Sequence, residues 1–116
     1  MKFKLIMALV SDSETDAVLD AARDAGATGA TIVTSCRGEG LIPGKTFFGL
    51  DLSGQRDILL FLVEEHLSRQ ILERIEKVGS FEEKSGTGIA FQLAIEDAVG
   101  LSHQIQTISN EIEDEI

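Results

Sequence analysis

Glycines and cationic side chains gather in one stretch, residues 34–49, which reads Thr-Ser-Cys-Arg-Gly-Glu-Gly-Leu-Ile-Pro-Gly-Lys-Thr-Phe-Phe-Gly. This stretch holds the only proline of the chain. Arg37, Lys45 and the amide groups of a glycine-rich backbone are suited to binding an anion. Phe47 and Phe48 add apolar surface. A connection this long in a small domain is usually functional or disordered, so we take it as the candidate working part of the molecule.

Three other motifs suggest chemistry, and each has a plainer explanation. Residues 40–46 resemble a P-loop, but the spacing puts Glu39 where that motif needs its first glycine. Residues 64–66, Glu-Glu-His, could join a metal site, although acidic residues are also favoured at the start of a helix. Cys36 beside Arg37 could be a redox-sensitive thiol or simply a small apolar residue. No spacing supports a Ser-His-Asp or Cys-His site, so we do not expect an enzyme.

The composition is that of one globular domain. The chain has 116 residues, of which 43% are hydrophobic and 26% are charged. Its formal net charge of −10 argues against a nucleic-acid partner, because such binding needs clustered cations. No apolar run approaches the length that membrane insertion requires. A single cysteine excludes a disulfide within the chain and fits a reducing cytoplasm.

The period of the apolar residues predicts the elements that hold this loop. Strict alternation or continuous apolar runs indicate strands, and apolar residues three and four apart indicate helices. A capping box at residues 11–14, Ser-Asp-Ser-Glu, is expected to begin the first helix, and Gly26 to end it. Gly79 is expected to end the second helix. The predicted strands are 3–10, 30–35, 57–63 and 89–95, and the predicted helices are 11–25 and 65–78.

This order, β-α-β, long loop, β-α-β, predicts an α+β fold: a ferredoxin-like βαββαβ sandwich with the long loop between strands two and three. Two helices can cover only one face of a four-stranded sheet. The strands at 3–10 and 57–63 nevertheless carry apolar residues on both faces. The second face therefore needs a cover, and we expect other copies of the chain to provide it.

Two glycine motifs within this order carry a resemblance to a known family. Residues 37–40, Arg-Gly-Glu-Gly, open the long loop, and residues 86–88, Gly-Thr-Gly, precede the last strand with its Phe91. With these motifs the chain resembles the PII signal-transduction family, the nitrogen regulatory proteins P-II, in its divergent PII-like branch. The resemblance implies a homotrimer that binds adenine nucleotides in clefts between subunits and presses its T-loop against a transporter or enzyme. It implies a PII-like domain at 1–102, with the T-loop at about 37–56 and the B-loop at about 80–88. The acids at 111, 113, 114 and 115 indicate an acidic tail at 103–116.

The resemblance also assigns site residues. Phe47 and Phe48 are either a docking patch or part of the core, and the sequence favours neither. The expected ligand-binding residues are Arg37, Gly38, Gly40, Gly86, Thr87 and Gly88, and the expected partner-binding residues are Pro43, Lys45, Phe47 and Phe48.

Departures from the family pattern narrow the expected ligand. Ile89 stands where the family's B-loop has a phosphate-binding lysine, and no arginine stands near Gly100 or Ser102. Leu41 and Ile42 replace the arginine and glutamine that serve ATP, magnesium and 2-oxoglutarate. We therefore expect AMP or ADP as the ligand, if a nucleotide binds, and expect neither ATP with magnesium nor 2-oxoglutarate. The chain has no tyrosine, so the uridylylation of some family members is excluded.

The sequence thus predicts a non-catalytic, cytoplasmic regulator with a protein target such as a membrane transporter or a metabolic enzyme. The alternative is a trimer similar to the CutA-type proteins, which would bind a ligand or metal without a protein target.

Overall fold

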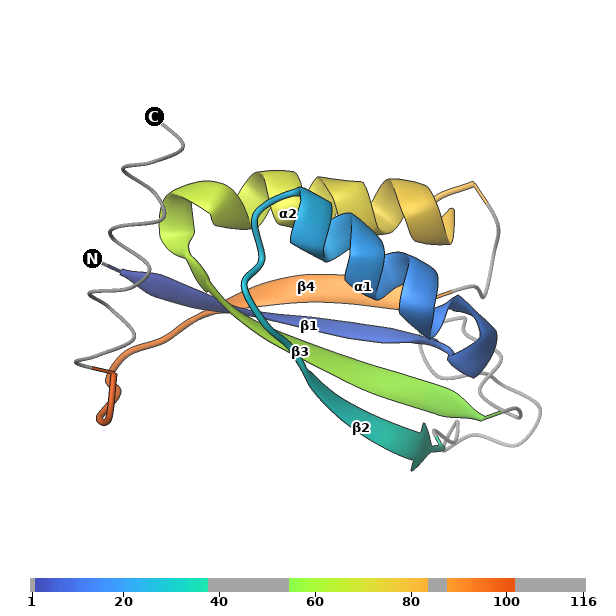
Figure 1. The fold of residues 1–116 in the computed structure, drawn as a ribbon, viewed down its shortest axis with the longest axis horizontal. Helices are drawn as coiled ribbons and strands as arrows, with labels where there is room; N and C mark the ends of the chain where they lie inside the picture. Colours follow the sequence, from blue (N-terminus) through green and yellow to red (C-terminus); the bar gives the residue numbers. More distant parts are fainter. Residues whose placement is uncertain (1, 38–54, 84–87, 102–116) are drawn as a thin grey trace, which may run out of the picture.

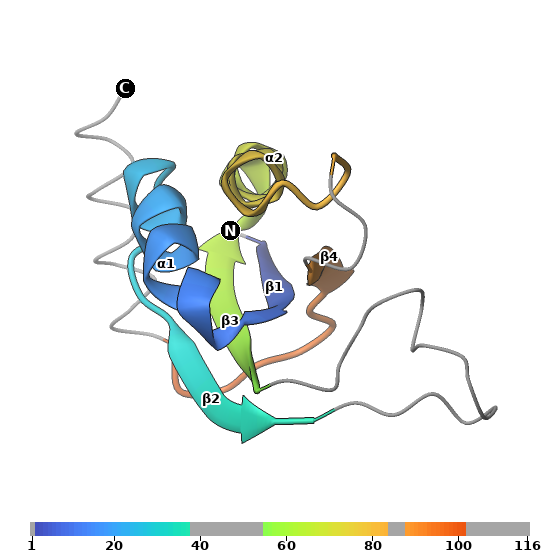
Figure 2. The ribbon, with the colours of Figure 1, turned by 90° about the vertical axis from the view of Figure 1, so that its right-hand side faces the viewer.

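The computed structural model describes residues 2–37, 55–83 and 88–101. Its four strands form one antiparallel sheet in the order β2-β3-β1-β4, and both helices lie on the same face of that sheet (Figures 1 and 2). The predicted α+β sandwich is confirmed. The elements are β1 (Phe3–Ser11), a 3-10 turn η1 (Asp12–Glu14), α1 (Thr15–Asp24), β2 (Thr31–Cys36), β3 (Arg56–Glu64), α2 (Glu65–Gly79) and β4 (Gly88–Ala94).

The core lies between the helices and the two central strands. Alternate residues of β1 and β3 point toward the helices and are buried, and Phe61 of β3 is the largest of the fully buried side chains. From the helices come Val18 and Ala22 of α1 and Ile71 and Ile75 of α2. Their helical spacing is the amphipathic pattern that predicted these helices from sequence.

The other face of the sheet carries no helix of the described chain, and it is apolar. Strand pairing puts Leu5 beside Leu62 and Leu93, Met7 beside Leu60 and Phe91, and Leu9 beside Ile58 and Ile89. We call these nine residues the open face. Those on the central strands are half-buried by their neighbours, whereas Phe91 and Leu93 on the edge strand are 40% and 44% exposed.

The predicted capping box at the start of the first helix is wrong. Ser11 is the last residue of β1, where it pairs with Arg56, and its side chain makes no capping hydrogen bond. The Ser11 hydroxyl lies 3.1 Å from that of Ser13 instead. Ser11 has the extended backbone of an N-cap residue and begins the turn η1, but its hydroxyl makes no capping bond, and α1 begins only at Thr15.

The left-handed residue after a helix is a glycine at the end of α1 but a serine at the end of α2. Gly26 follows α1 with φ of 118°, the left-handed conformation expected of it. At the end of α2, Gly79 is still helical, and Ser80 adopts the left-handed conformation with φ of 55°. A side chain at Gly79 would overlap the ring of Phe81. Gly79 is therefore needed for packing; it ends α2 as the sequence predicts, while Ser80 is the left-handed residue.

Candidate functional site

Both glycine-motif loops leave the sheet at the same end. The register places Cys36 of β2 and Ser11 of β1 on either side of Arg56, the first residue of β3. One residue along, Val10 pairs with Gly88, the first residue of β4. The ends of β2 and β1 and the starts of β3 and β4 therefore form one row, at the right of Figure 1. We call this row the loop end of the sheet.

Arg37 is the predicted ligand residue that the structure places most clearly at the loop end. It directly follows β2 and its side chain is exposed. Just before it, the pairing of β2 with β3 shifts between Val33 and Cys36, and Ser35 takes a φ of 60°. This bulge bends the strand and so sets the direction in which Arg37 leaves the sheet.

Gly88 is the second predicted ligand residue within the described chain, and it has a packing role. A Cβ atom there would lie 2.6 Å from a ring carbon of Phe81 and 2.9 Å from the carbonyl oxygen of Leu9. Only glycine fits this contact without movement. Arg37 and Gly88 lie on opposite edge strands, so three strand spacings of about 4.8 Å put them roughly 14 Å apart across the sheet. The strands of one chain therefore do not bring the two motifs together.

The remaining predicted residues lie outside the described chain. They are the ligand-binding candidates Gly38, Gly40, Gly86 and Thr87 and the partner-binding candidates Pro43, Lys45, Phe47 and Phe48.

A buried polar group at the loop end was missed by the sequence reasoning. Arg56, Asp57 and Thr15 are 8%, 7% and 7% exposed. The Thr15 hydroxyl donates a 2.6 Å hydrogen bond to Asp57 Oδ2, which joins α1 to β3. The amide of Asp12 donates to the carbonyl oxygen of Gln55, 3.3 Å away. These bonds fix the point at which the chain re-enters the sheet after the long loop. The only sequence signal was a charged pair, Arg-Asp, ahead of a wholly apolar strand.

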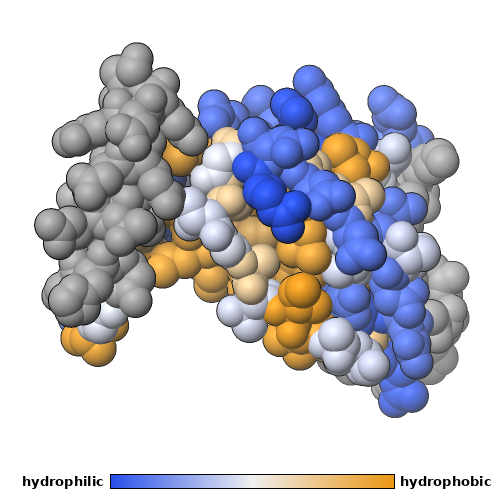
Figure 3. Space-filling model, viewed as in Figure 1, coloured by the Kyte–Doolittle hydropathy of each residue, from blue (hydrophilic) through white to orange (hydrophobic). Residues whose placement is uncertain are grey.

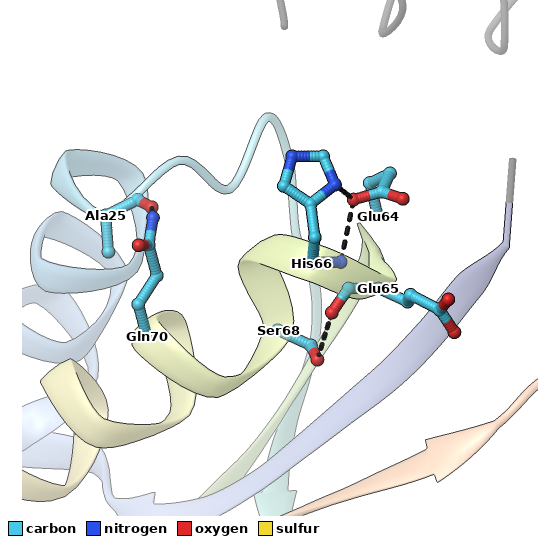
Figure 4. A network of polar contacts seen from close by, with 6 residues as sticks. All are labelled: Ala25, Glu64, Glu65, His66, Ser68 and Gln70. Carbon is cyan, nitrogen blue, oxygen red and sulfur yellow. Dashed lines mark hydrogen bonds and ion pairs between the residues drawn. The ribbon is translucent and has the colours of Figure 1, made fainter.

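The Glu-Glu-His motif begins a helix. Glu64 accepts a 2.8 Å hydrogen bond from the amide of His66, which caps α2, and the His66 ring also contacts the Glu64 carboxylate (Figure 4). Across the helices, Gln70 Nε2 donates to the carbonyl oxygen of Ala25 at 2.9 Å. Within the described residues, no three His, Cys, Asp or Glu side chains come together as they would around a metal ion.

Cys36 is a half-buried free thiol at the loop end. Its sulfur lies 3.5 Å from the carbonyl oxygen of Val33 and 3.8 Å from that of Thr34. Both contacts are to its own strand.

Two hollows lie at the opposite end of the sheet from the loop end. The smaller, about 120 Å³, lies where the chain passes from α1 to β2, between Arg23, Thr28 and Phe61. The larger, about 530 Å³, lies where β1 begins and the chain leaves β4, beside Phe3 and Ala98. Neither includes a residue that the sequence singled out as ligand-binding.

The sequence of residues 3–104 matches the family model described as nitrogen regulatory protein P-II. The chain belongs to the nitrogen regulatory protein P-II family. The resemblance drawn from the two glycine motifs is therefore confirmed, and the family's name describes regulatory proteins. No curated protein sequence matches the chain.

Solved structures agree on the fold. A PII-like signaling protein from Thermus thermophilus is 23% identical, with a TM-score of 0.61 over 82% of this chain and 87% of its own. CPII from Thiomonas intermedia, solved with ADP, AMP and acetate, is 20% identical, with a TM-score of 0.61 over 83% and 90% of the two chains. Its apo form, described as a nitrogen regulatory PII-like protein, is 20% identical, with a TM-score of 0.62 over 82% of this chain and 90% of its own. In the described parts of this P-II protein, no helix is long and apolar enough to cross a membrane.

Proposed function

We propose that this P-II protein is a non-catalytic, cytoplasmic homotrimer that senses AMP or ADP and regulates a transporter or metabolic enzyme through its T-loop. The observation that carries the proposal is the common origin of both glycine-motif loops at the loop end of the sheet. A ligand held between these loops would restrain the base of the T-loop and bias its conformation. We assign the PII-like domain to residues 1–102 and an acidic tail to 103–116.

The number of cations at the loop end favours a nucleotide with few phosphates. Among the residues that the structure describes at the loop end, Arg37 has an exposed guanidinium and Arg56 is buried in the sheet. A triphosphate needs several converging cations, which a chain of net charge −10 does not concentrate at the loop motifs. CPII, solved with ADP and AMP, shows that the fold can hold these nucleotides. The remaining ligand contacts would come from Gly38, Gly40, Gly86, Thr87 and the amide of Gly88.

The open face supports the trimer. Its nine residues form a continuous apolar surface over three strands, and an apolar surface of this extent marks an interface in most proteins. A closed assembly of three copies would bury the same surface on each subunit.

Isothermal titration calorimetry of the native protein with AMP, ADP and ATP plus magnesium tests the ligand. We expect AMP or ADP to bind and Arg37→Ala to weaken that binding about tenfold or more, because a charge-assisted hydrogen bond to phosphate is lost. Arg74→Ala, in the middle of α2, is the matched control and should bind as the native chain does. Tighter binding of ATP with magnesium than of AMP and ADP would contradict the proposal. A melting temperature raised by a divalent metal alone would favour the CutA-like alternative.

A further inference from the structure

The chain turns back toward the sheet directly after α2. Gly79 is the last helical residue, and Ser80 takes the left-handed conformation, with φ of 55°. The amide of Phe81 then donates to the carbonyl oxygen of Glu76 at 3.2 Å. A serine rarely adopts a positive φ, and residues held in this way cluster at ligand sites and switch regions. The result of this turn is the position of the Phe81 ring.

The Phe81 ring packs against two glycines. The same ring carbon would lie 2.1 Å from a Cβ atom at Gly79 and 2.6 Å from one at Gly88. Phe81 is half-buried and packs against the core. Figure 3 shows polar residues over the outer surfaces of the helices and apolar residues lower down, at the level of the sheet. The ring thus turns away from the polar surface and joins the end of α2 to the start of β4, both at the right of Figure 1.

Gly88 has a second close neighbour. Besides the ring, the carbonyl oxygen of Leu9 in β1 would lie 2.9 Å from a Cβ atom at Gly88. Within the described chain β4 is an edge strand that pairs with β1 alone, and Gly88 lies opposite Val10. Strand pairing therefore restrains Gly88 through one neighbouring strand, and Phe81 adds a restraint from the helix layer.

A restraint at Gly88 matters for ligand binding. Gly88 is the member of the Gly-Thr-Gly motif that the structure describes, and its amide is a ligand contact in the proposed function. Glycine has the greatest backbone freedom of any residue, so its amide keeps a fixed direction only if its surroundings hold it. Groups that packing holds in place bind more tightly, because less conformational freedom is lost when the ligand binds.

We propose that Phe81 is a positioning residue of the ligand site: its ring holds Gly88 against β1 and so fixes the direction of the Gly88 amide. Phe81 acts through Gly88 and does not touch the ligand. Ser80 and Gly79 support this arrangement, because the left-handed turn directs the ring and the missing Cβ atom leaves room for it. The inference rests on the proposed binding of AMP or ADP.

Isothermal titration calorimetry with AMP and ADP tests the role of Phe81. Phe81→Ala should weaken binding of the nucleotide that the native chain binds by about fivefold or more, because Gly88 is no longer restrained. The matched control is Val18→Ala, which shortens a fully buried side chain of α1, on the far side of the helix layer from β4 (Figure 2). It should also lower the free energy of unfolding, yet leave binding within about twofold of the native value. Urea unfolding identifies a temperature at which every variant is folded.

A double-mutant cycle separates positioning from a general loss of structure. Gly88→Ala displaces the same backbone, so it should weaken binding by itself, and Phe81→Ala should weaken it by no more than about twofold further in that background. Additive losses would show that Phe81 does not act through Gly88 and would overturn the inference. Phe81→Leu, which keeps an apolar side chain without the ring, takes the place of Phe81→Ala if that variant does not fold.

The same titrations separate this inference from the proposed function. A native chain that binds neither AMP nor ADP contradicts both. A native chain that binds one of them, with Phe81→Ala binding equally well or Val18→Ala losing as much affinity, contradicts the inference alone.

Discussion

At the residue scale, the ring of Phe81 packs against Gly79 and Gly88. This packing gives a structural reason for the glycine at position 88, which looks like part of a ligand-binding motif in the sequence. The Phe81 ring lies where side chains at Gly79 and Gly88 would have to be. At Gly79 the three nearest atoms all belong to the Phe81 ring, whereas at Gly88 the carbonyl oxygen of Leu9 is also close, 2.9 Å from the added Cβ. The glycine motif before β4 is thus required by packing, whatever it also binds.

This packing gives a prediction that separates the two glycines. Gly79→Ala and Gly88→Ala should each lower the free energy of unfolding by about 1–3 kcal/mol, as overpacking does. In a Phe81→Ala background, Gly79→Ala should become neutral or stabilising, since alanine is the better helix former by roughly 1 kcal/mol. Gly88→Ala should still destabilise, because the Leu9 carbonyl oxygen is backbone. Urea unfolding measures all of these.

The control for the glycine series is Gly29→Ala, where an added Cβ meets nothing within 4 Å. It should change the free energy of unfolding by no more than about 0.5 kcal/mol. If Phe81→Ala rescued Gly88→Ala completely, the contact with Leu9 would not matter and our account of Gly88 would be wrong.

Thr15 and Asp57 form the other residue-scale contact, a buried hydrogen bond between positions 42 apart in the sequence. Thr15→Val keeps the shape of the side chain and removes the donor. We expect a loss of about 2–3 kcal/mol in the free energy of unfolding, because the buried Asp57 carboxyl loses this hydrogen bond. Thr15→Ser keeps the hydroxyl and should cost clearly less. Equal losses for the two variants in urea unfolding would show that the methyl group, and not the hydrogen bond, stabilises this position.

At the scale of elements, the sequence predicted what depends on periodicity and missed what depends on pairing. The apolar runs at 3–10 and 57–63 and the helical spacing of Ile71 and Ile75 located these elements within one or two residues. The capping box failed because the Ser11 hydroxyl contacts Ser13 and caps no amide, and a 3-10 turn precedes α1. The bulge in β2 has no local sequence signal, since Thr-Ser-Cys suits an ordinary strand.

The bulge in β2 can be tested through its left-handed residue. Ser35 has a φ of 60°, which a β-branched side chain adopts only at a cost of about 1–2 kcal/mol. Ser35→Val should therefore lower the melting temperature, whereas Ser35→Gly should leave it unchanged or raise it slightly. Thr34→Val, the adjacent exposed position, has no positive φ and is the control that should be nearly neutral. A neutral Ser35→Val, measured by calorimetry, would mean that β2 is regular there.

At the scale of the whole molecule, the sequence predicted the apolar second face of the sheet better than it predicted the ligand site. The doubly apolar strands indicated an uncovered sheet face, and the structure shows that face in rows of paired apolar residues. The site was only partly predictable, because short glycine motifs do not state which glycines serve packing. The structural role of Arg56 and Asp57 could not be predicted from the sequence, because it depends on the pairing of β3 with β1 and β2.

The last prediction concerns the open face: a charged side chain introduced at its centre should dissociate the proposed trimer into single chains. Leu60 lies in the middle of β3, beside Met7 of β1, and on the face away from the helices. Leu60→Lys places an ammonium group where three copies would meet, and desolvating it without a partner is costly. Light scattering should give about three times the chain mass of 12.5 kDa for the native protein and a single-chain mass for the variant.

Val78→Lys is the matched control for this experiment, because Val78 is a 39% exposed apolar residue on α2, on the helix side of the sheet. It introduces the same charge and should keep the trimer mass. Should Leu60→Lys be insoluble, a dilution series of the native chain still decides the question, since a buried apolar interface of this extent should hold at micromolar concentration. A native protein of single-chain mass at that concentration would mean that the open face is covered by something other than two further copies.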